Sequence, residues 1–202
     1  NAYYRTIRSD LYTKDGTYLI RYCFGKNEET FTVAPGVTDI YESAFDCFNI
    51  NSSLSSIILP DSLVSIWDFA FRSCDAEFVI PKNVRNISRY AFSDSRIESF
   101  VVSPDNPWFC ARDGVLYTKD MKELVSIPEC IASETFVLDA GTEKIRTGAM
   151  YENKTLRYFV IPADSALTWL EKSSLVFGSA AQLCGVYIHR AEPFAMDRYA
   201  MA

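Results

Sequence analysis

The sequence predicts a repeat solenoid that is mainly β, in which short strands stack on one another turn after turn. Two observations predict it. Offsetting the 202-residue chain against itself by 105 residues, so that Asn1 falls on Asn106, aligns 1–45 with 106–150 without a gap. A shorter repeat of apolar-x-apolar triplets also recurs along the chain. One such turn cannot bury its own apolar face, so stacking must supply the core.

The long repeat carries the phrase Leu-Tyr-Thr-Lys-Asp twice, at 11–15 and 116–120. In each copy two apolar runs flank a polar turn, the pattern of a β-hairpin. We therefore expect hairpins near 8–24 and 113–128, inserted between turns of the solenoid.

The short repeat sets the spacing of the turns. Its seven triplets begin at residues 31, 57, 78, 100, 136, 159 and 186. Each is a short strand with two side chains turned inward, and periods in the twenties are those of a leucine-rich-type solenoid. A second inward anchor follows at Ile40, Ile66, Ile87 and Ile145. We expect regular turns near 28–102 and 134–190, one solenoid over 1–190, and a C-terminal cap or linker at 191–202.

One segment carries a family resemblance. Residues 57–74 read Ile-x-Leu-Pro-x-x-Leu-x-x-Ile-x-x-x-Ala-Phe-x-x-Cys. This pattern resembles the BspA-type leucine-rich repeat of bacterial surface proteins, and NPWFCARDGVLYTKDMKEL at 106–124 is similar to an insert common in that family. The sequence departs from the pattern at Ala34 and Asp139, which stand at the Pro position, and at Met150, which stands for Phe.

The resemblance implies a fold, a location and a role. The fold is a right-handed leucine-rich-repeat coil with short strands, and turns or short helices, in each turn. The location is extracellular or the bacterial cell surface, and we expect the export signal or anchor to lie outside this sequence. The role is adhesion or protein binding, with no catalytic residues.

Composition and motifs agree with a non-enzymatic role. The net charge of −6 comes without a cluster of Lys and Arg, which argues against a nucleic-acid partner. No apolar run approaches the roughly 20 residues that span a bilayer. His189 is the only histidine and is expected at a solvated strand end, so a multi-histidine metal site is excluded. We predict no catalytic residue, metal or cofactor. The six cysteines form no C-x-x-C pair, and their bridging stays open.

The candidate binding surface is the middle residue of each triplet, which faces outward if its neighbours face inward. Thr32 is the polar member of this column. The apolar members, which we predict to contact a partner, are Ile58, Val79, Val101, Val137, Val160 and Tyr187. Tyr41 and Trp67, just after two of the Ile anchors, are further candidates. The alternative is that β-branched residues simply suit strands and that the aromatics pack at an edge.

These features favour a non-enzymatic adhesion module that recognises a protein partner through the open sheet of the solenoid. One alternative is a structural spacer within a longer surface protein. Another is a glycan-binding module that uses Trp67, Trp108 and Trp169.

Overall fold

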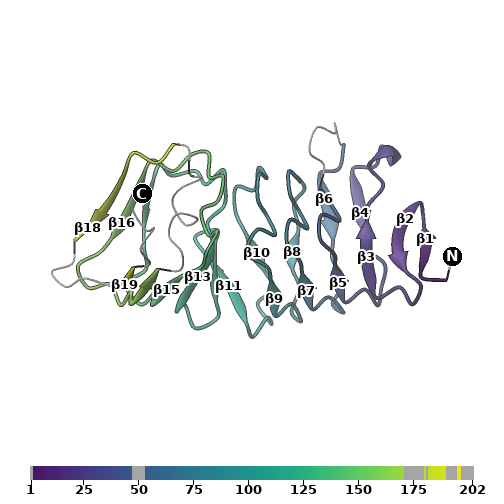
Figure 1. Cartoon of the computed structure of the whole chain (residues 1–202), viewed down its shortest axis with the longest axis horizontal. Helices are drawn as coiled ribbons and strands as arrows, with labels where there is room; N and C mark the ends of the chain where they lie inside the picture. Colours follow the sequence, from purple (N-terminus) through teal and green to yellow (C-terminus); the bar gives the residue numbers. More distant parts are fainter. Residues whose placement is uncertain (1, 47–52, 171–179, 181, 190–194, 197–202) are drawn as a thin grey trace. The chain divides into compact units, whose positions relative to one another are not determined.

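The computed structural model describes residues 2–46, 53–170, 180, 182–189 and 195–196. It divides into two compact units, which we call unit 1 (1–97 with 101–107) and unit 2 (98–100 with 108–202). Each is a stack of short strands, as the sequence predicts (Figure 1). That one solenoid runs through 1–190 stays a prediction, and the proposed cap at 191–202 lies largely outside the described residues.

One sheet of unit 1 joins the first hairpin to the repeats. Its order is β1-β2-β3-β5-β7-β9, antiparallel as far as β3 and parallel from there. Figure 1 shows the parallel strands side by side. The strands are β1 (Tyr4–Ile7), β2 (Asp10–Thr13), β3 (Tyr18–Arg21), β5 (Asp39–Ile40), β7 (Ser65–Ile66) and β9 (Asn86–Ile87). The predicted hairpin is thus the second half of a three-stranded meander.

The triplets of unit 1 form the other row of strands. These are β4 (Thr30–Thr32), β6 (Ser56–Ile58), β8 (Val79–Ile80) and β10 (Val101–Val102). β4 pairs with β6 and β8 with β10, both in parallel, and a bridge between Ser56 and Glu77 links the two pairs. One 3-10 turn, η1 (Phe24–Lys26), is the only helix within the described part of the chain.

Unit 2 repeats the order of the unit 1 strands over its first five strands. Its first five strands have the bounds of β1 to β5 moved by 105 residues, and the bulge between Leu11 and Tyr12 recurs between Leu116 and Tyr117. These strands are β11 (Phe109–Arg112), β12 (Val115–Thr118), β13 (Glu123–Ser126), β14 (Thr135–Val137) and β15 (Lys144–Ile145). The remaining strands are β16 (Tyr158–Ile161), β17 (Trp169–Leu170), β18 (Gly185–Ile188) and β19 (Ala195–Met196). The sheet orders are β11-β12-β13-β15-β17-β19 and β14-β16-β18.

The repeated phrase closes the hairpin turns. Thr13 Oγ1 donates to Asp15 Oδ1 at 2.6 Å, and the same oxygen accepts from the Thr17 N–H at 3.0 Å. Thr118 and Asp120 make the matching bond at 2.7 Å, with the Lys122 N–H at 3.1 Å. Thr and Asp suit this position because their short side chains bond to backbone nearby. Thr and Asp of the phrase therefore make the same turn in both units.

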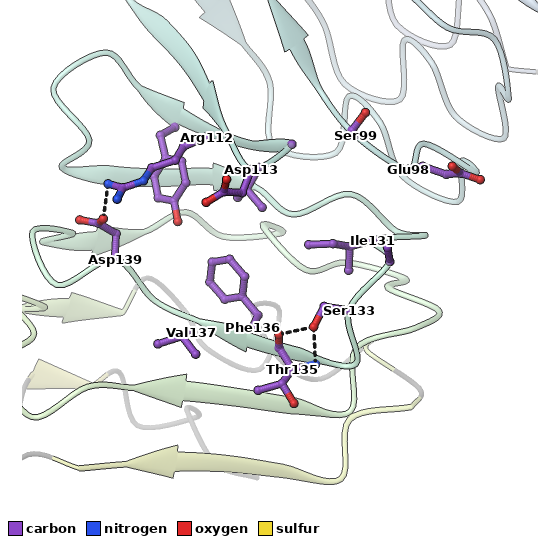
Figure 2. Close-up of a pocket in the computed structure, with 14 residues that line it drawn as sticks. Glu98, Ser99, Arg112, Asp113, Ile131, Ser133, Thr135, Phe136, Val137 and Asp139 are labelled. Carbon is purple, nitrogen blue, oxygen red and sulfur yellow. Dashed lines mark hydrogen bonds and ion pairs between the residues drawn. The ribbon is translucent and has the colours of Figure 1, made fainter.

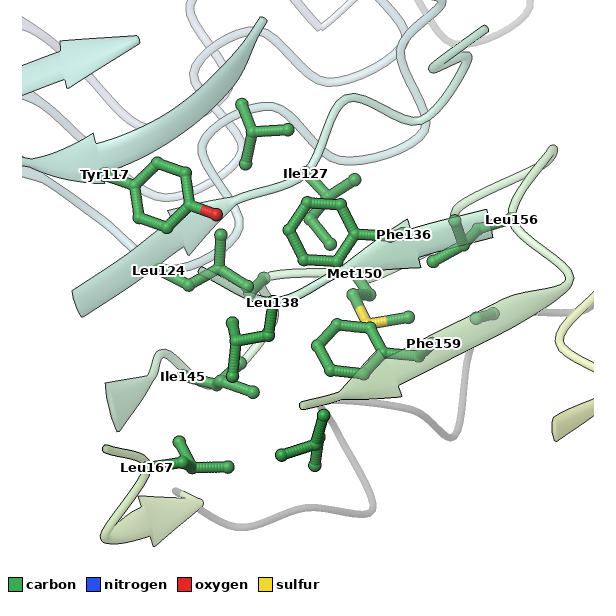
Figure 3. Close-up of a cluster of buried hydrophobic side chains, with 14 residues drawn as sticks. Tyr117, Leu124, Ile127, Phe136, Leu138, Ile145, Met150, Leu156, Phe159 and Leu167 are labelled. Atoms are coloured by element: carbon green, nitrogen blue, oxygen red, sulfur yellow. The ribbon is translucent and has the colours of Figure 1, made fainter. Parts of the chain in front are cut away.

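The core of each unit is a stack of the predicted inward residues. In unit 1, Phe45 and Phe71 are fully buried, with ring centroids 5.1 Å apart and an interplanar angle of 5°. In unit 2, Met150 is the counterpart of Phe45, and Phe136 packs on Phe159 at 5.3 Å (Figure 3). The Ile anchors are buried in both units. The predicted fold class, a mainly β repeat solenoid, is confirmed.

Candidate functional site

The outward residues of the unit 1 triplets lie on neighbouring strands, and we call them the unit 1 column: Thr32, Ile58, Val79 and Val101. Thr32 is the Cα partner of Ile58, and Val79 that of Val101. The bridge between Ser56 and Glu77 carries the register across from β6 to β8. The three apolar side chains are each about half exposed, at 52, 49 and 50 %. Ile57 and Ile80, which flank Ile58 and Val79 on their strands, are buried, so the column faces outward.

The unit 2 column is the corresponding row on β14, β16 and β18: Val137, Val160 and Tyr187. The parallel register pairs Val137 with Val160 and Val160 with Tyr187. Val137 and Tyr187 are exposed, whereas Val160 is half-buried between them. The ring of Tyr187 lies 5.9 Å from that of Tyr158, measured between centroids. This column therefore includes an exposed aromatic ring, which the unit 1 column lacks.

Tyr41 and Trp67 lie apart from the unit 1 column. They follow β5 and β7, which belong to the sheet built on the hairpin. With Tyr18 they form an aromatic row whose ring centroids are 6.3 Å and 6.1 Å apart. Trp67 Nε1 donates to Asp39 Oδ1 at 2.9 Å, which fixes the indole although 41 % of the residue is exposed. The candidate residues of unit 1 thus make two surfaces.

Sequence reasoning missed a hollow in unit 2. It lies along β14 and has a volume of about 520 Å³. Its walls come from the end of β11, the turn to β12, the segment 98–99 and the segment 131–133 (Figure 2). Phe136 and Tyr117, both buried, form its apolar part. Every residue that lines it belongs to unit 2.

An ion pair stands at one end of the hollow. Arg112 Nη1 lies 2.5 Å from Asp139 Oδ2, while Asp139 Oδ1 accepts from the Gly141 N–H at 3.0 Å. Asp139 is one of the two departures from Pro in the repeat pattern. That departure was the one signal in the sequence that pointed here. Burial, with a smaller contribution from the charge of Asp139, raises the pKa of Tyr117, so its hydroxyl stays protonated.

The remaining sequence expectations concern chemistry. His189 is exposed directly after β18, and its backbone N–H donates to the Ile161 carbonyl at 3.0 Å. No group of three or more His, Cys, Asp or Glu within the described residues could hold a metal ion. In the same part of the chain, no helix is long and apolar enough to cross a membrane. Cys74 is buried, whereas Cys47 and the side chain of Trp169 lie outside the described residues.

Comparison with known proteins assigns the repeat. Residues 40–107 match the BspA type leucine rich repeat region, in six copies. Over these residues the sequence carries BspA-type leucine-rich repeats. No curated protein sequence matches the chain.

Two of the solved structures to which this chain is similar share its fold, with TM-scores above 0.5. A leucine rich cell surface protein from Faecalibacterium prausnitzii A2-165 is 25 % identical with a TM-score of 0.58, over 77 % of this chain and 46 % of that protein. The chain therefore spans less than half of that relative's length. A leucine-rich repeat protein from Eubacterium ventriosum ATCC 27560 is 15 % identical with a TM-score of 0.51, over 95 % and 71 %. The pneumococcal vaccine antigen PcpA is also 15 % identical, with a TM-score of 0.49, over 91 % and 67 %.

Proposed function

We propose that this chain is a non-enzymatic, surface-displayed bacterial module that binds a protein partner through the unit 1 column. The observation that carries the proposal is the row Ile58, Val79 and Val101, three branched apolar side chains half exposed on adjacent strands. Covering apolar surface releases roughly 25 cal/mol per Å². A contiguous apolar patch is more often a contact surface than a chance exposure.

The location rests on the family and on one relative. The F. prausnitzii protein, at 25 % identity, is described as a cell surface protein. A partner outside the cell, either a host protein or another bacterial surface protein, fits that location.

The test compares a disrupted column with a matched control. In the first variant, Ile58→Ser, Val79→Lys and Val101→Ser are combined; the control is Asn86→Lys, an exposed position on β9 of the other sheet. Both are screened by surface plasmon resonance against purified extracellular-matrix and serum proteins. For a protein bound by the wild type, we expect at least a roughly tenfold loss in the first variant and none in the control. Equal binding by all three proteins, with equal melting temperatures, refutes the role of the column.

The aromatic row supports a second candidate, binding of a glycan. Tyr18, Tyr41 and Trp67 present three rings in sequence on one face, and a hydrogen bond holds Trp67 in place. A glycan array probed with wild type and Trp67→Ala tests it. Trp108→Ala is the control, since Trp108 is equally exposed in unit 2 and outside this row. Loss of a signal in Trp67→Ala alone supports the row, and equal signals count against it.

A further inference from the structure

The hollow of unit 2 lies at an open strand edge. β14 ends its sheet and pairs only with β16 among the described strands. In this parallel register Phe136 turns its N–H and C=O to β16, while Thr135 and Val137 turn theirs the other way, to the hollow. Ser133 Oγ already donates to the Thr135 carbonyl at 2.7 Å and accepts from the Thr135 N–H at 3.1 Å. The groups available at this edge are therefore the N–H and C=O of Val137.

The wall of the hollow opposite β14 is formed by the segment 98–100, which packs closely against the hairpin turn at Gly114. The Phe100 N–H donates to the Gly114 carbonyl at 2.7 Å, which ties the segment 98–100 to the hairpin turn. Gly114 has φ +77°, and a Cβ there would lie 2.8 Å from the Cβ of Ser99. Only glycine permits this approach. The wall is thus fixed by backbone.

Unit 1 shows why the hollow exists in unit 2. At the positions of Ile131 and Ser133, unit 1 has Lys26 and Glu28, whose longer side chains pair at 3.1 Å. Shorter side chains in unit 2 leave volume beside the strand. A volume near 520 Å³ is within the range of roughly 300–1,000 Å³ for ligand pockets. It suits a few residues of extended chain and not a folded domain.

The charged residues that line the hollow indicate which kind of peptide it would bind. Three carboxylates line the hollow, at Glu98, Asp113 and Asp139, against one guanidinium, which pairs with Asp139. Within the described residues no ion pair involves Glu98 or Asp113. Unit 1 has the opposite charge at the matching turn, where Arg8 is the counterpart of Asp113. The surplus of negative charge favours a basic occupant.

We propose that the hollow binds an extended peptide segment of a partner, added as a strand to the free edge of β14, with one Lys or Arg side chain beside Asp113. Strand addition to an exposed edge is a common mode of peptide recognition, in which backbone bonds give affinity and pockets give specificity. This site does not rest on the unit 1 column. It would take a linear segment, whereas the column would take a folded surface.

The first test uses the whole chain and immobilised pools of five-residue peptides whose central residue is Lys, Arg, Ala or Glu. The Lys and Arg pools are expected to bind more strongly than the Ala and Glu pools. Asp113→Asn should weaken binding of the basic pools about fivefold, the range of a partly exposed ion pair. Asp164→Asn, an exposed carboxylate of unit 2 outside the hollow, should leave it unchanged. Binding by no pool at about 1 mM peptide, or no preference for a basic centre, overturns the proposal.

The second test asks whether the bound peptide is a strand. A peptide from the basic pools is N-methylated at alternate backbone positions, giving two registers. The peptide whose N-methyl groups face β14 should not bind, because it lacks the N–H groups that bond to the strand edge. The peptide methylated at the other positions should still bind. Bound peptide should also slow hydrogen exchange of the Val137 amide and leave that of Thr32, its counterpart in unit 1, unchanged. Equal loss in both registers, or an unprotected Val137 amide, contradicts strand addition.

Discussion

Lys26 Nζ lies 2.6 Å from Asp10 Oδ2 in unit 1, and Asp10 is almost fully buried. The ammonium group also lies over the rings of Tyr22 and Phe31, 4.5 Å and 4.7 Å from their centroids. The counterparts of Asp10 and Lys26 in unit 2 are Val115 and Ile131, an apolar pair. The same hairpin therefore packs either on an ion pair or on two aliphatic side chains.

The difference between the two units also involves a backbone hydrogen-bond donor. In unit 1 the Cys23 N–H donates to Asp10 Oδ1 at 2.9 Å. Its counterpart in unit 2 is Pro128, which has no N–H. A buried donor needs an acceptor, so the loss of the carboxylate and the loss of the donor go together. Three positions change as a set.

The first prediction concerns replacing these three residues of unit 1 by their counterparts from unit 2. Lys26→Ile alone should lower the free energy of unfolding by about 3 kcal/mol, because it leaves the Asp10 carboxylate buried without its cation. Combining it with Asp10→Val and Cys23→Pro recreates the residues of unit 2 and should return the stability to within about 1 kcal/mol of wild type. Urea unfolding monitored by circular dichroism measures both. A triple variant no more stable than Lys26→Ile contradicts the equivalence of the two packings.

The second prediction concerns the hairpin turn and pH. Bonds from the Thr13 hydroxyl, the Thr17 N–H and the Thr17 hydroxyl lower the pKa of Asp15 to about 2. A carboxyl with a lowered folded pKa stabilises the fold when ionised. That contribution is complete above the unfolded pKa of about 3.9 and is lost as the pH falls through about 2. The urea midpoint of Asp15→Asn should therefore lie below that of wild type at pH 5, with the gap closing towards pH 2.

Asp120→Asn is the corresponding variant in unit 2, because hydrogen bonds from the Thr118 hydroxyl and the Lys122 N–H also lower the pKa of Asp120. It should show the same dependence on pH. Asp164→Asn, an exposed carboxylate away from both hairpin turns, is the matched control and should track wild type at every pH. A gap for Asp15→Asn that is constant from pH 5 to pH 2 rules out the turn as its source.

The sequence predicted the parts of this fold that follow a period. The Ile anchors and the outward residues of the triplets recur at fixed places, so the burial of the first and the exposure of the second follow from alternation alone. β1 and β11 were not predicted, because Tyr4–Ile7 is mostly exposed and only Phe109 of Phe109–Arg112 is buried. Such strands show no alternation. The hollow was missed for another reason: part of its wall, the segment 98–99 and the turn after β11, is far from β14 in the sequence, and only folding brings these parts together.

A third prediction concerns a buried amide that ties two turns of unit 1 together. Asn106 is fully buried, and its Nδ2 donates to the carbonyls of Pro81 and Val84 at 2.8 Å and 2.9 Å. Asn106→Asp puts a carboxylate against two carbonyl oxygens, which should cost about 3 kcal/mol at pH 7. Burial raises the pKa of such a group, so protonation at pH 4 should restore part of the stability. A loss that is the same at pH 4 and pH 7 contradicts this account.

The final prediction separates the two units through their cores. Phe71 stacks between Phe45 at 5.1 Å and Phe92 at 5.9 Å, so it connects three successive turns of unit 1. Phe71→Ala should lower the stability of unit 1 by about 4 kcal/mol through the cavity it leaves. In a repeat array each turn is stabilised by its neighbours, so the damage should spread to the turns on both sides.

Hydrogen exchange followed by mass spectrometry resolves that spread. Peptides covering β5, β7 and β9 should exchange faster in Phe71→Ala, while peptides covering β13 and β15 of unit 2 keep the wild-type rate. Phe71→Leu is the matched control, since it retains an apolar side chain and should produce a much smaller change in the same peptides. If β13 and β15 accelerate as much as β7, the two units unfold together as one cooperative block, and the division at residues 97–108 has no thermodynamic meaning.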